Sequence, residues 1–423
     1  MPPRYHTPHP LRGFLTVLLS GSLLFAGLRA SSLAQVRTAI TPDGTLGTTV
    51  TQNGTTYTIN GGTIKGPNQF HSFDRLSVGT NDTARFSGPT GIANILSRVT
   101  GGQQSVIYGR LQSTIPGANL YLLNPSGVLF GPNASLNVTG SFHVSTADFL
   151  RFTDGATFSA HLGAQSTLTV APPAAFGFLG PQPAPLTIQG SMLRVPEGKA
   201  LSVVGGDVQI EGGTLHAPSG RLQLASVAAP GEVRFSPLEQ APEFQVDGIA
   251  RLGRLALMQG TRVEASGAGA GGSGGPGGTV LIRSGRLLVD RSFIRADTLG
   301  EAHGASLGLD LQVAAEAVIA NSSELHARPH GAGQGGEIMV QVGKLTLTDG
   351  SRIITSSAGA GQAGKLMVTA SEALLITGHD QGGDVSGLFS NAGGGGHAGQ
   401  LMVSAPTLRM EGGRIQALAA ENS

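Results

Sequence analysis

The sequence contains no cysteine and no tryptophan, and only 13% of its 423 residues are charged. Without cysteine the chain uses no disulfide bonds. Ordinary soluble domains carry about a quarter charged residues, and the aromatic content here is only 5%, so a conventional globular core is not expected. The net charge of +1 provides no basic field. Nucleic acid is therefore not an expected partner.

Glycine and proline are abundant instead, with 66 and 23 residues respectively. This composition is typical either of disorder or of a tightly turned β array. Regular alternation of Val, Leu and Ile along the chain argues against disorder, because a disordered segment buries too little apolar surface to offset the entropy of folding. The composition therefore favours the β array.

The N-terminus has the order of a secretory signal peptide. Two arginines precede the apolar stretch 13–28, and Ser32–Ala34 supplies small residues before a cleavage site between Ala34 and Gln35. The apolar run is short for a bilayer span, which needs about 20 residues. No second such run follows. We therefore expect residues 1–34 to be a signal peptide and the mature chain to have no transmembrane span.

Two proline-led corners lie close together in the stretch NLYLLNPSGVLFGPNASLNV. In the first, Asn124 holds the first turn position, Pro125 the second, Ser126 the third and Gly127 the fourth. This order fits a type I turn, because proline presets φ near −65° at the second position. Residues 131–134 (GPNA) form the second corner. A turn every few residues leaves room only for very short strands between the corners.

Such short strands suit a chain that winds into coils. One circuit from Leu120 to Phe142 takes about twenty residues, which is typical of the coils of a parallel β-helix. Aliphatic side chains would point inward and stack on those of the next coil. The predicted fold is all-β, a right-handed parallel β-helix, also called a β-solenoid.

Self-similar segments dominate residues 246–423. A Gly-x-aliphatic core returns at irregular intervals as GGTVLI (277–282), GGEIMV (335–340), AGKLMV (363–368) and AGQLMV (398–403). Variable spacing around a constant core is expected when repeats differ by insertions at the corners. We expect the strands to pair in parallel, with the inward residues Leu366, Val368, Leu401 and Val403 stacked in files. The Pro-rich segment 171–185 is predicted to be an irregular excursion from the coils.

Residues that could take part in catalysis or bind a metal are sparse. The acidic residues considered for catalysis are scattered and form no paired cluster: Asp207, Glu211, Glu264, Asp290, Asp297 and Asp310. His326 and His330 are four residues apart, but Pro329 between them makes a helical metal pair improbable. The Gly/Asp loop 378–384 lacks the repeated nonapeptide pattern of calcium-binding coils. We therefore predict no catalytic residue, no metal and no cofactor, and a protein that is not an enzyme.

Three blocks in order resemble the secretion domain of two-partner-secretion exoproteins, the filamentous haemagglutinin N-terminal domain family. They are residues 61–79, 94–111 and 118–150, the last built around the Asn-Pro turn. The variant is similar to that of large cyanobacterial members. The family's separate Asn-Pro-Asn-Leu motif has no counterpart here, where the chain reads IANILSRV. The resemblance places the secretion domain at residues 35–245.

The resemblance implies an export route. The chain would reach the periplasm of a Gram-negative-type bacterium, be recognised by a partner outer-membrane transporter, and fold outside as a secreted or surface-exposed, adhesin-like stalk. The Asn124–Gly127 turn would carry the secretion motif. Host-cell, neighbouring-cell or matrix carbohydrate and protein surfaces are the partners considered for the exported chain. The alternatives are a β-helical carbohydrate-active enzyme, such as a polysaccharide lyase or hydrolase, and a carrier of a toxin domain.

Overall fold

The fold is described from a computed structural model, which covers residues 36–236, 244–246, 248–269, 274–393 and 395–418. The predicted signal peptide and its cleavage site between Ala34 and Gln35 lie outside the described residues. Every regular element within these ranges is a β-strand. No helix in this part of the chain is long and apolar enough to span a membrane.

Nineteen strands form the largest sheet, called the large sheet here. They are β1 (Ala39–Pro42), β4 (Thr63–Lys65), β5 (Asn68–Ser77), β7 (Asn94–Val99), β8 (Ser105–Ile107), β10 (Asn119–Leu123), β11 (Val128–Phe130), β13 (Phe142–Ser145), β17 (Leu186–Gln189), β19 (Ala200–Gly205), β20 (Val208–Glu211), β22 (Arg221–Ser226), β25 (Arg254–Met258), β27 (Thr279–Asp290), β29 (Leu307–Ala320), β31 (Glu337–Thr348), β33 (Leu366–Thr377), β35 (Leu401–Ser404) and β36 (Leu408–Glu411).

Two further sheets accompany it. The second sheet has 13 strands: β2 (Thr48–Asn53), β3 (Thr56–Gly61), β6 (Thr83–Phe86), β9 (Arg110–Ser113), β12 (Ser135–Asn137), β18 (Met192–Arg194), β21 (Thr214–His216), β26 (Arg262–Glu264), β28 (Phe293–Arg295), β30 (Glu324–His326), β32 (Arg352–Ile354), β34 (Gly387–Phe389) and β37 (Arg414–Gln416). The side sheet has five: β14 (Phe149–Phe152), β15 (Thr157–Ser159), β16 (Pro173–Phe178), β23 (Gly231–Phe235) and β24 (Phe244–Gln245).

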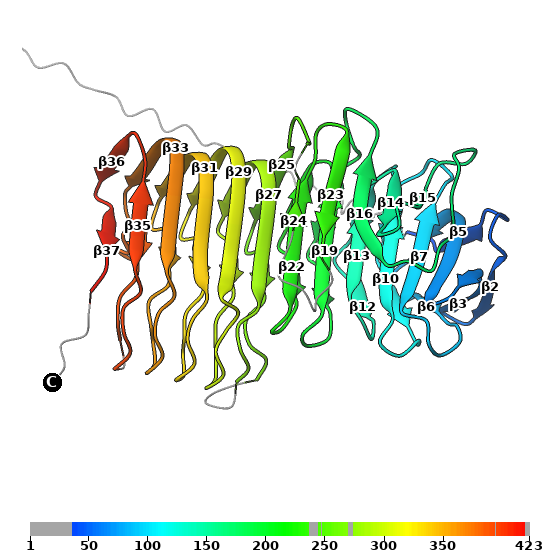
Figure 1. The fold of residues 1–423 in the computed structure, drawn as a ribbon, viewed down its shortest axis with the longest axis horizontal. Coiled ribbons are helices and arrows are strands. Elements are labelled where there is room, and N and C mark those ends of the chain that lie inside the picture. Colours follow the sequence, from blue (N-terminus) through cyan, green and yellow to red (C-terminus); the bar gives the residue numbers. More distant parts are fainter. Residues whose placement is uncertain (1–35, 237–243, 247, 270–273, 394, 419–423) are drawn as a thin grey trace, which may run out of the picture. The chain divides into compact units, whose positions relative to one another are not determined.

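One turn of the chain, called a coil here, passes through three short strands before it returns. The chain runs along β10, β11 and β12, and then β13 lies parallel to β10 with Leu120 opposite Phe142. The same succession repeats along the described chain, so that strands of successive coils stand side by side (Figure 1). In the four coils that contain β27, β29, β31 and β33, two of the three strands merge into one of 12 to 14 residues. The predicted parallel β-helix is confirmed.

Inward aliphatic side chains stack from coil to coil. β33 pairs in parallel with β35, placing Leu366 opposite Leu401 and Val368 opposite Val403. Leu366 and Val368 are fully buried, whereas Leu401 and Val403 are half-buried and pack against the same core. The predicted files are therefore present. The difference in burial arises because no described coil follows β35, β36 and β37 to cover them.

The recurring glycines mark places where neighbouring coils approach closely. A Cβ atom on Gly364 would lie 2.0 Å from the carbonyl oxygen of Gly336, and one on Gly399 would lie 2.0 Å from that of Gly364. Real Cβ atoms do not come so close, so only glycine fits these stacked corners. This contact explains why the sequence returns to glycine directly before each aliphatic strand of the repeat.

The side sheet departs from the sequence prediction. Residues 171–185 were predicted to be irregular, yet Pro173–Phe178 form β16, which pairs antiparallel with β14 and β23. Proline is compatible with the first position of a strand because its missing N–H need not join the ladder. The segment does leave the coils, as expected. It forms a sheet that covers outward-facing apolar residues of the large sheet, including the buried Phe70 and Leu123.

No break in the coils marks the predicted division at residue 245. β22 pairs with β19 on one side and with β27 on the other, with Arg221 opposite Thr279. The buried core of the coils runs from Ile40 to Leu388 as one cluster. The described residues from Val36 onward form one compact unit. The separation of a secretion domain from a repeat region at this point stays a prediction.

Candidate functional site

The predicted secretion-motif turn follows β10 and has the expected geometry. The backbone N–H of Gly127 donates to the carbonyl oxygen of Asn124 at 3.0 Å, and the N–H of Ser126 donates to Asn124 Oδ1 at 2.9 Å. Ser126 has no positive φ, which excludes a type II turn, while Gly127 adopts a φ of 104°. Glycine suits this last position because an L side chain rarely adopts such a φ.

Asn124 also fastens this turn to the preceding coil. Its side chain is fully buried, and Nδ2 donates to the carbonyl oxygen of Gln103 at 2.8 Å and to Ser105 Oγ at 2.9 Å. A buried side chain cannot itself contact a partner protein. Pro125 and Ser126 are half-buried and form the accessible part of the turn. Asn124 therefore positions the turn, and Pro125 and Ser126 are its solvent-accessible residues.

A second feature, which the sequence analysis missed, is a ladder of asparagines across three coils. Asn94 Nδ2 donates to Asn68 Oδ1 at 2.9 Å, and Asn119 Nδ2 donates to Asn94 Oδ1 at 3.1 Å. The ladder continues because the N–H of Ser141 donates to Asn119 Oδ1 at 2.9 Å. One asparagine comes from each of the three resemblance blocks. Each begins a strand, and this shared position is the signal that could have revealed the asparagine ladder.

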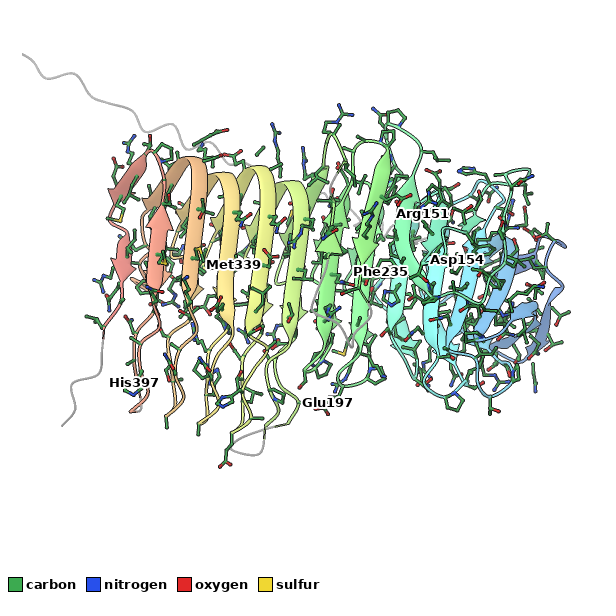
Figure 2. All side chains as sticks on the ribbon, in the orientation of Figure 1. Arg151, Asp154, Glu197, Phe235, Met339 and His397 are labelled. Atoms are coloured by element: carbon green, nitrogen blue, oxygen red, sulfur yellow. The ribbon has the colours of Figure 1, made fainter. Side chains whose placement is uncertain are left out.

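A groove of about 300 Å³ lies beside the asparagine ladder, lined by residues of the large sheet and of β23. Tyr121 stacks on His143 with ring centroids 4.3 Å apart, and the ring of Phe235 in β23 (Figure 2) lies 5.8 Å from that of His143 and 6.4 Å from that of Tyr121. His143 Nδ1 lies 2.8 Å from Ser202 Oγ. Burial lowers the pKa of His143 to about 3, so the ring is neutral at physiological pH. These contacts join the side sheet to the coils.

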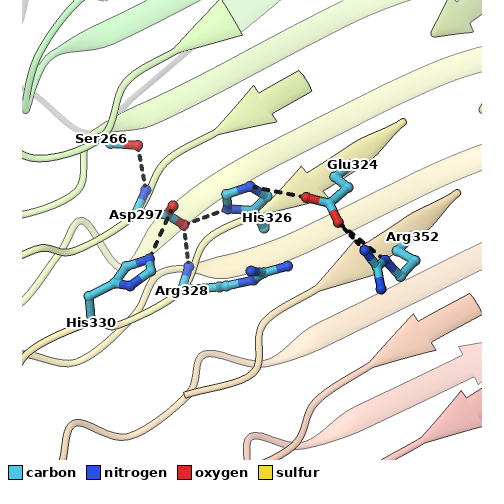
Figure 3. Close-up of polar contacts among 7 residues, drawn as sticks. All are labelled: Ser266, Asp297, Glu324, His326, Arg328, His330 and Arg352. Carbon is cyan, nitrogen blue, oxygen red and sulfur yellow. Dashed lines mark hydrogen bonds and ion pairs between the residues drawn. The ribbon is translucent and has the colours of Figure 1, made fainter. Parts of the chain in front are cut away.

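The repeat region holds a buried charged cluster, shown in Figure 3. Asp297 comes just after β28, and its Oδ1 lies 2.8 Å from His326 Nδ1. The same oxygen accepts a hydrogen bond from the backbone N–H of Arg328 at 2.7 Å. Its Oδ2 lies 3.4 Å from His330 Nε2. Burial alone would raise the pKa of Asp297, but hydrogen bonds from both histidines and from Arg328 outweigh it and hold the pKa below its ordinary value.

Sequence reasoning had treated Asp297 as one of several scattered acids. The structure instead brings it to both histidines, because His326 ends β30 opposite Arg295, the last residue of the adjacent strand β28, and Asp297 comes two residues after Arg295. His326 and His330 are not on a helix, as predicted. In the part of the chain that the structure describes, no group of three His, Asp or Glu residues has an arrangement that could hold a metal ion.

The other acidic residues lie apart and serve local contacts. Asp310 forms a buried ion pair with Arg283 at 2.6 Å, and Asp207 accepts the backbone N–H of Arg254 at 2.9 Å. Asp290 accepts the Asn321 side chain at 2.5 Å. Glu211 accepts from Gln209, and Glu264 ends β26. None of these acids pairs with another across a groove, so the arrangement does not resemble the paired carboxylates of a glycosidase.

The loop 378–384 closes on itself. Asp380 Oδ1 accepts the backbone N–H groups of Gly382 and Asp384, both at 2.9 Å. The loop borders a surface depression of about 830 Å³ together with Arg291 and Asn321. The carboxylate of Asp380 thus serves as a turn acceptor, in agreement with the prediction of a solvated loop.

Comparison with known proteins agrees with this architecture. The family described as "TPS secretion domain" matches residues 38–281, which extends beyond the predicted end at 245. A segment of 85 residues, 20% of this chain, is 36% identical to the heme/hemopexin-binding protein of Haemophilus influenzae. That match spans 9% of the relative's length, so the chain corresponds to a small part of that protein.

Solved structures were compared as well. The secretion domain of HMW1 from Haemophilus influenzae aligns over 89% of this chain and 100% of its own, with a TM-score of 0.52 and 14% identity. The filamentous hemagglutinin secretion domain aligns over 88% of this chain and 100% of its own, with a TM-score of 0.35 and 14% identity. Only the first is similar enough to indicate a shared fold.

Both named relatives with a stated source come from Haemophilus, so the resemblance to cyanobacterial members stays a prediction. With a family match over more than half its length and a parallel β-helix of matching fold, the chain belongs to the TPS secretion-domain family of two-partner-secretion exoproteins.

Proposed function

We propose that the protein is a secreted or surface-exposed exoprotein, exported through a partner outer-membrane transporter. The observation that carries this proposal is the family match over residues 38–281. In this proposal residues 1–34 direct export to the periplasm and are removed. Residues 35–245 are then recognised by the transporter, with the Asn124–Gly127 turn as part of the recognised surface.

The coil contacts support folding that proceeds outward from the secretion domain. Each coil hydrogen-bonds to the one before it, as at Leu120 opposite Phe142 and Leu366 opposite Leu401. A solenoid grows by such nearest-neighbour stacking, so an ordered first coil is a template for the next. The asparagine ladder fixes the register of three early coils. Folding of successive coils on the far side of the membrane would then bias movement of the chain outward.

For the exported protein we propose a structural role, as an adhesin-like stalk that carries binding surfaces on the repeat region, residues 246–423. The alternative of a β-helical carbohydrate-active enzyme is less well supported. Polysaccharide cleavage needs acidic groups that converge on the sugar, and the acids Asp207, Asp290 and Asp310 each serve a separate local contact. The buried Asp297 is enclosed by its histidines and is 5% exposed.

The first step of the route predicts a defined N-terminus. We expect protein recovered from the medium to begin at Gln35, because Ser32–Ala34 presents small residues to signal peptidase. N-terminal sequencing of the extracellular protein measures this directly. Replacing Ala34 with a bulky residue such as Phe should block removal and retain the chain at the inner membrane. Extracellular protein that still carries residues 1–34 would contradict the signal-peptide assignment.

A further inference from the structure

An open groove of about 340 Å³ lies on the second-sheet side of the repeat region. We call it the arginine groove. Its lining includes three arginines, one aromatic ring and two amides: Arg328, Arg352, Arg414, Phe389, Asn391 and Gln416. Every charged side chain in this lining is an arginine, and the remaining polar groups are hydroxyls and amides. The lining therefore suits a ligand that carries both negative charge and hydroxyl groups.

The arginines stand on different coils. Arg352 begins β32, Arg414 begins β37, and Arg328 follows β30. With adjacent strands about 4.8 Å apart, the four strands β30, β32, β34 and β37 span roughly 14 Å. The positive groups thus follow one another along the stack of coils. This arrangement fits a chain with repeated anionic groups better than a single small anion.

Register explains how the groove arises. Arg352 lies opposite Gly387 in β34, and Gly387 lies opposite Arg414 in β37. Gly387 has no side chain to fill the place between the two arginines. A Cβ atom there would lie 2.9 Å from the ring of Phe389, so that ring occupies the space instead. Phe389 is half-buried and offers an apolar face to a ligand between two guanidinium groups.

The charges around the groove are unequally compensated. Arg352 is paired with Glu324 at 2.6 Å and with Asp384 at 3.1 Å (Figure 3 shows the first pair). Arg414 is exposed, and among the described residues its side chain hydrogen-bonds to the neutral Gln416, at 3.3 Å. Arg328 also lines the groove and is half-buried, and the neighbouring Glu324 and Asp297 partly offset its charge. Arg414 is therefore the least compensated cation of the groove, and Arg328 adds a second positive group to the lining.

We propose that the arginine groove binds an anionic polysaccharide, with carboxylate or sulfate groups at Arg328 and Arg414 and a sugar ring on Phe389. Guanidinium groups bind such anions with paired hydrogen bonds. The amides of Asn391 and Gln416 supply further partners for sugar hydroxyls. Nucleic acid fits less well, because the net charge of +1 provides no extended basic field for a backbone that carries one phosphate charge per nucleotide. This site goes beyond the proposed export function and does not depend on it.

Binding of the purified chain from residue 35 to 423 tests the proposal, independently of export. The immobilised probes are polygalacturonate for carboxylate, dextran sulfate for sulfate, neutral dextran, and double-stranded DNA. We expect binding to at least one anionic polysaccharide, with the preferred probe showing which anion is used, and no binding to dextran or DNA. Affinity should fall as NaCl is added, because salt screens exposed charges.

Variants locate the site. Arg328→Gln and Arg414→Gln should each weaken binding at least about tenfold, the effect of one lost charge-assisted contact. Arg414 is exposed, so its replacement does not endanger folding. The matched control is Arg194→Gln with Arg262→Gln, which removes two exposed arginines of the same sheet outside the groove; we expect less than about a twofold change. Equal weakening by the control pair, DNA binding, or failure of both polysaccharides to bind would overturn the proposal.

Discussion

Asn124→Ile should abolish export while synthesis and signal cleavage stay normal. The variant loses the Nδ2 donors to Gln103 and Ser105 and the Oδ1 acceptor for Ser126. It also leaves buried polar groups without partners, which we expect to cost about 3 kcal/mol of unfolding free energy. Without the first coils as a template, the chain should accumulate or be degraded in the periplasm. Immunoblots of medium and periplasm measure the distribution.

Asn391→Ile is the matched control in a later corner. Asn391 is half-buried, and its Oδ1 accepts one hydrogen bond, from the N–H of Leu418 at 3.1 Å. We expect its export to stay close to that of the unmodified chain. Equal secretion of the two variants would remove the special role assigned to Asn124.

A third substitution separates recognition from folding at the same turn. Ser126→Lys alters the accessible part of the turn and keeps the backbone hydrogen bonds that Asn124 accepts. Reduced export of this variant, with an unchanged unfolding midpoint, is expected if the transporter reads the turn directly. Normal export of Ser126→Lys together with loss in Asn124→Ile would limit the role of the turn to folding.

Asp297→Ala should destabilise the repeat region by about 1 to 3 kcal/mol, the usual cost of leaving buried hydrogen-bond donors without an acceptor. The substitution leaves His326 and the backbone N–H of Arg328 without their acceptor. Guanidinium-induced unfolding followed by circular dichroism measures the change. Glu316→Ala is the control, since Glu316 is 39% exposed and pairs with Lys344 only at the surface. That change should cost less than about 1 kcal/mol.

The effect of Asp297 should also depend on pH. Because its pKa is lowered in the folded chain from 3.8, its contribution is fully present above that value and is lost as pH falls through the folded pKa. The difference in stability between the unmodified chain and Asp297→Ala should therefore shrink below about pH 3.8. A constant difference from pH 7 to pH 3 would contradict the assigned role of the carboxylate.

The predictions that the structure confirms rest on residues that are close together in the sequence or that visibly repeat. The turn at Asn124 follows from four adjacent residues, and the glycines before residues 337, 365 and 400 mark corners wherever the coil spacing varies. The parallel pairing of β33 with β35 also follows, because the two strands share the sequence LMV. Each of these features depends on residues that are neighbours in the sequence or on visible repetition.

Polar side-chain contacts between coils could not be predicted, because insertions of variable length hide the register wherever the strand sequence does not repeat. Asn68 and Asn94 are 26 residues apart, whereas Asn94 and Asn119 are 25 apart. Asp297 and His326 are separated by 29 residues. No fixed period links these pairs, so their approach appears only when the strands are aligned. The side sheet was missed because proline-rich composition indicates irregular structure more often than a strand edge.

Dependence of export on the partner transporter tests the account most directly. The full chain would be expressed in a Gram-negative host with and without the two-partner-secretion transporter from its own genome, and mature protein in the medium would be quantified. We expect extracellular protein only when the transporter is present, and periplasmic retention without it. Equal amounts in the medium under both conditions, or retention in the periplasm despite the transporter, would contradict the proposed two-partner route.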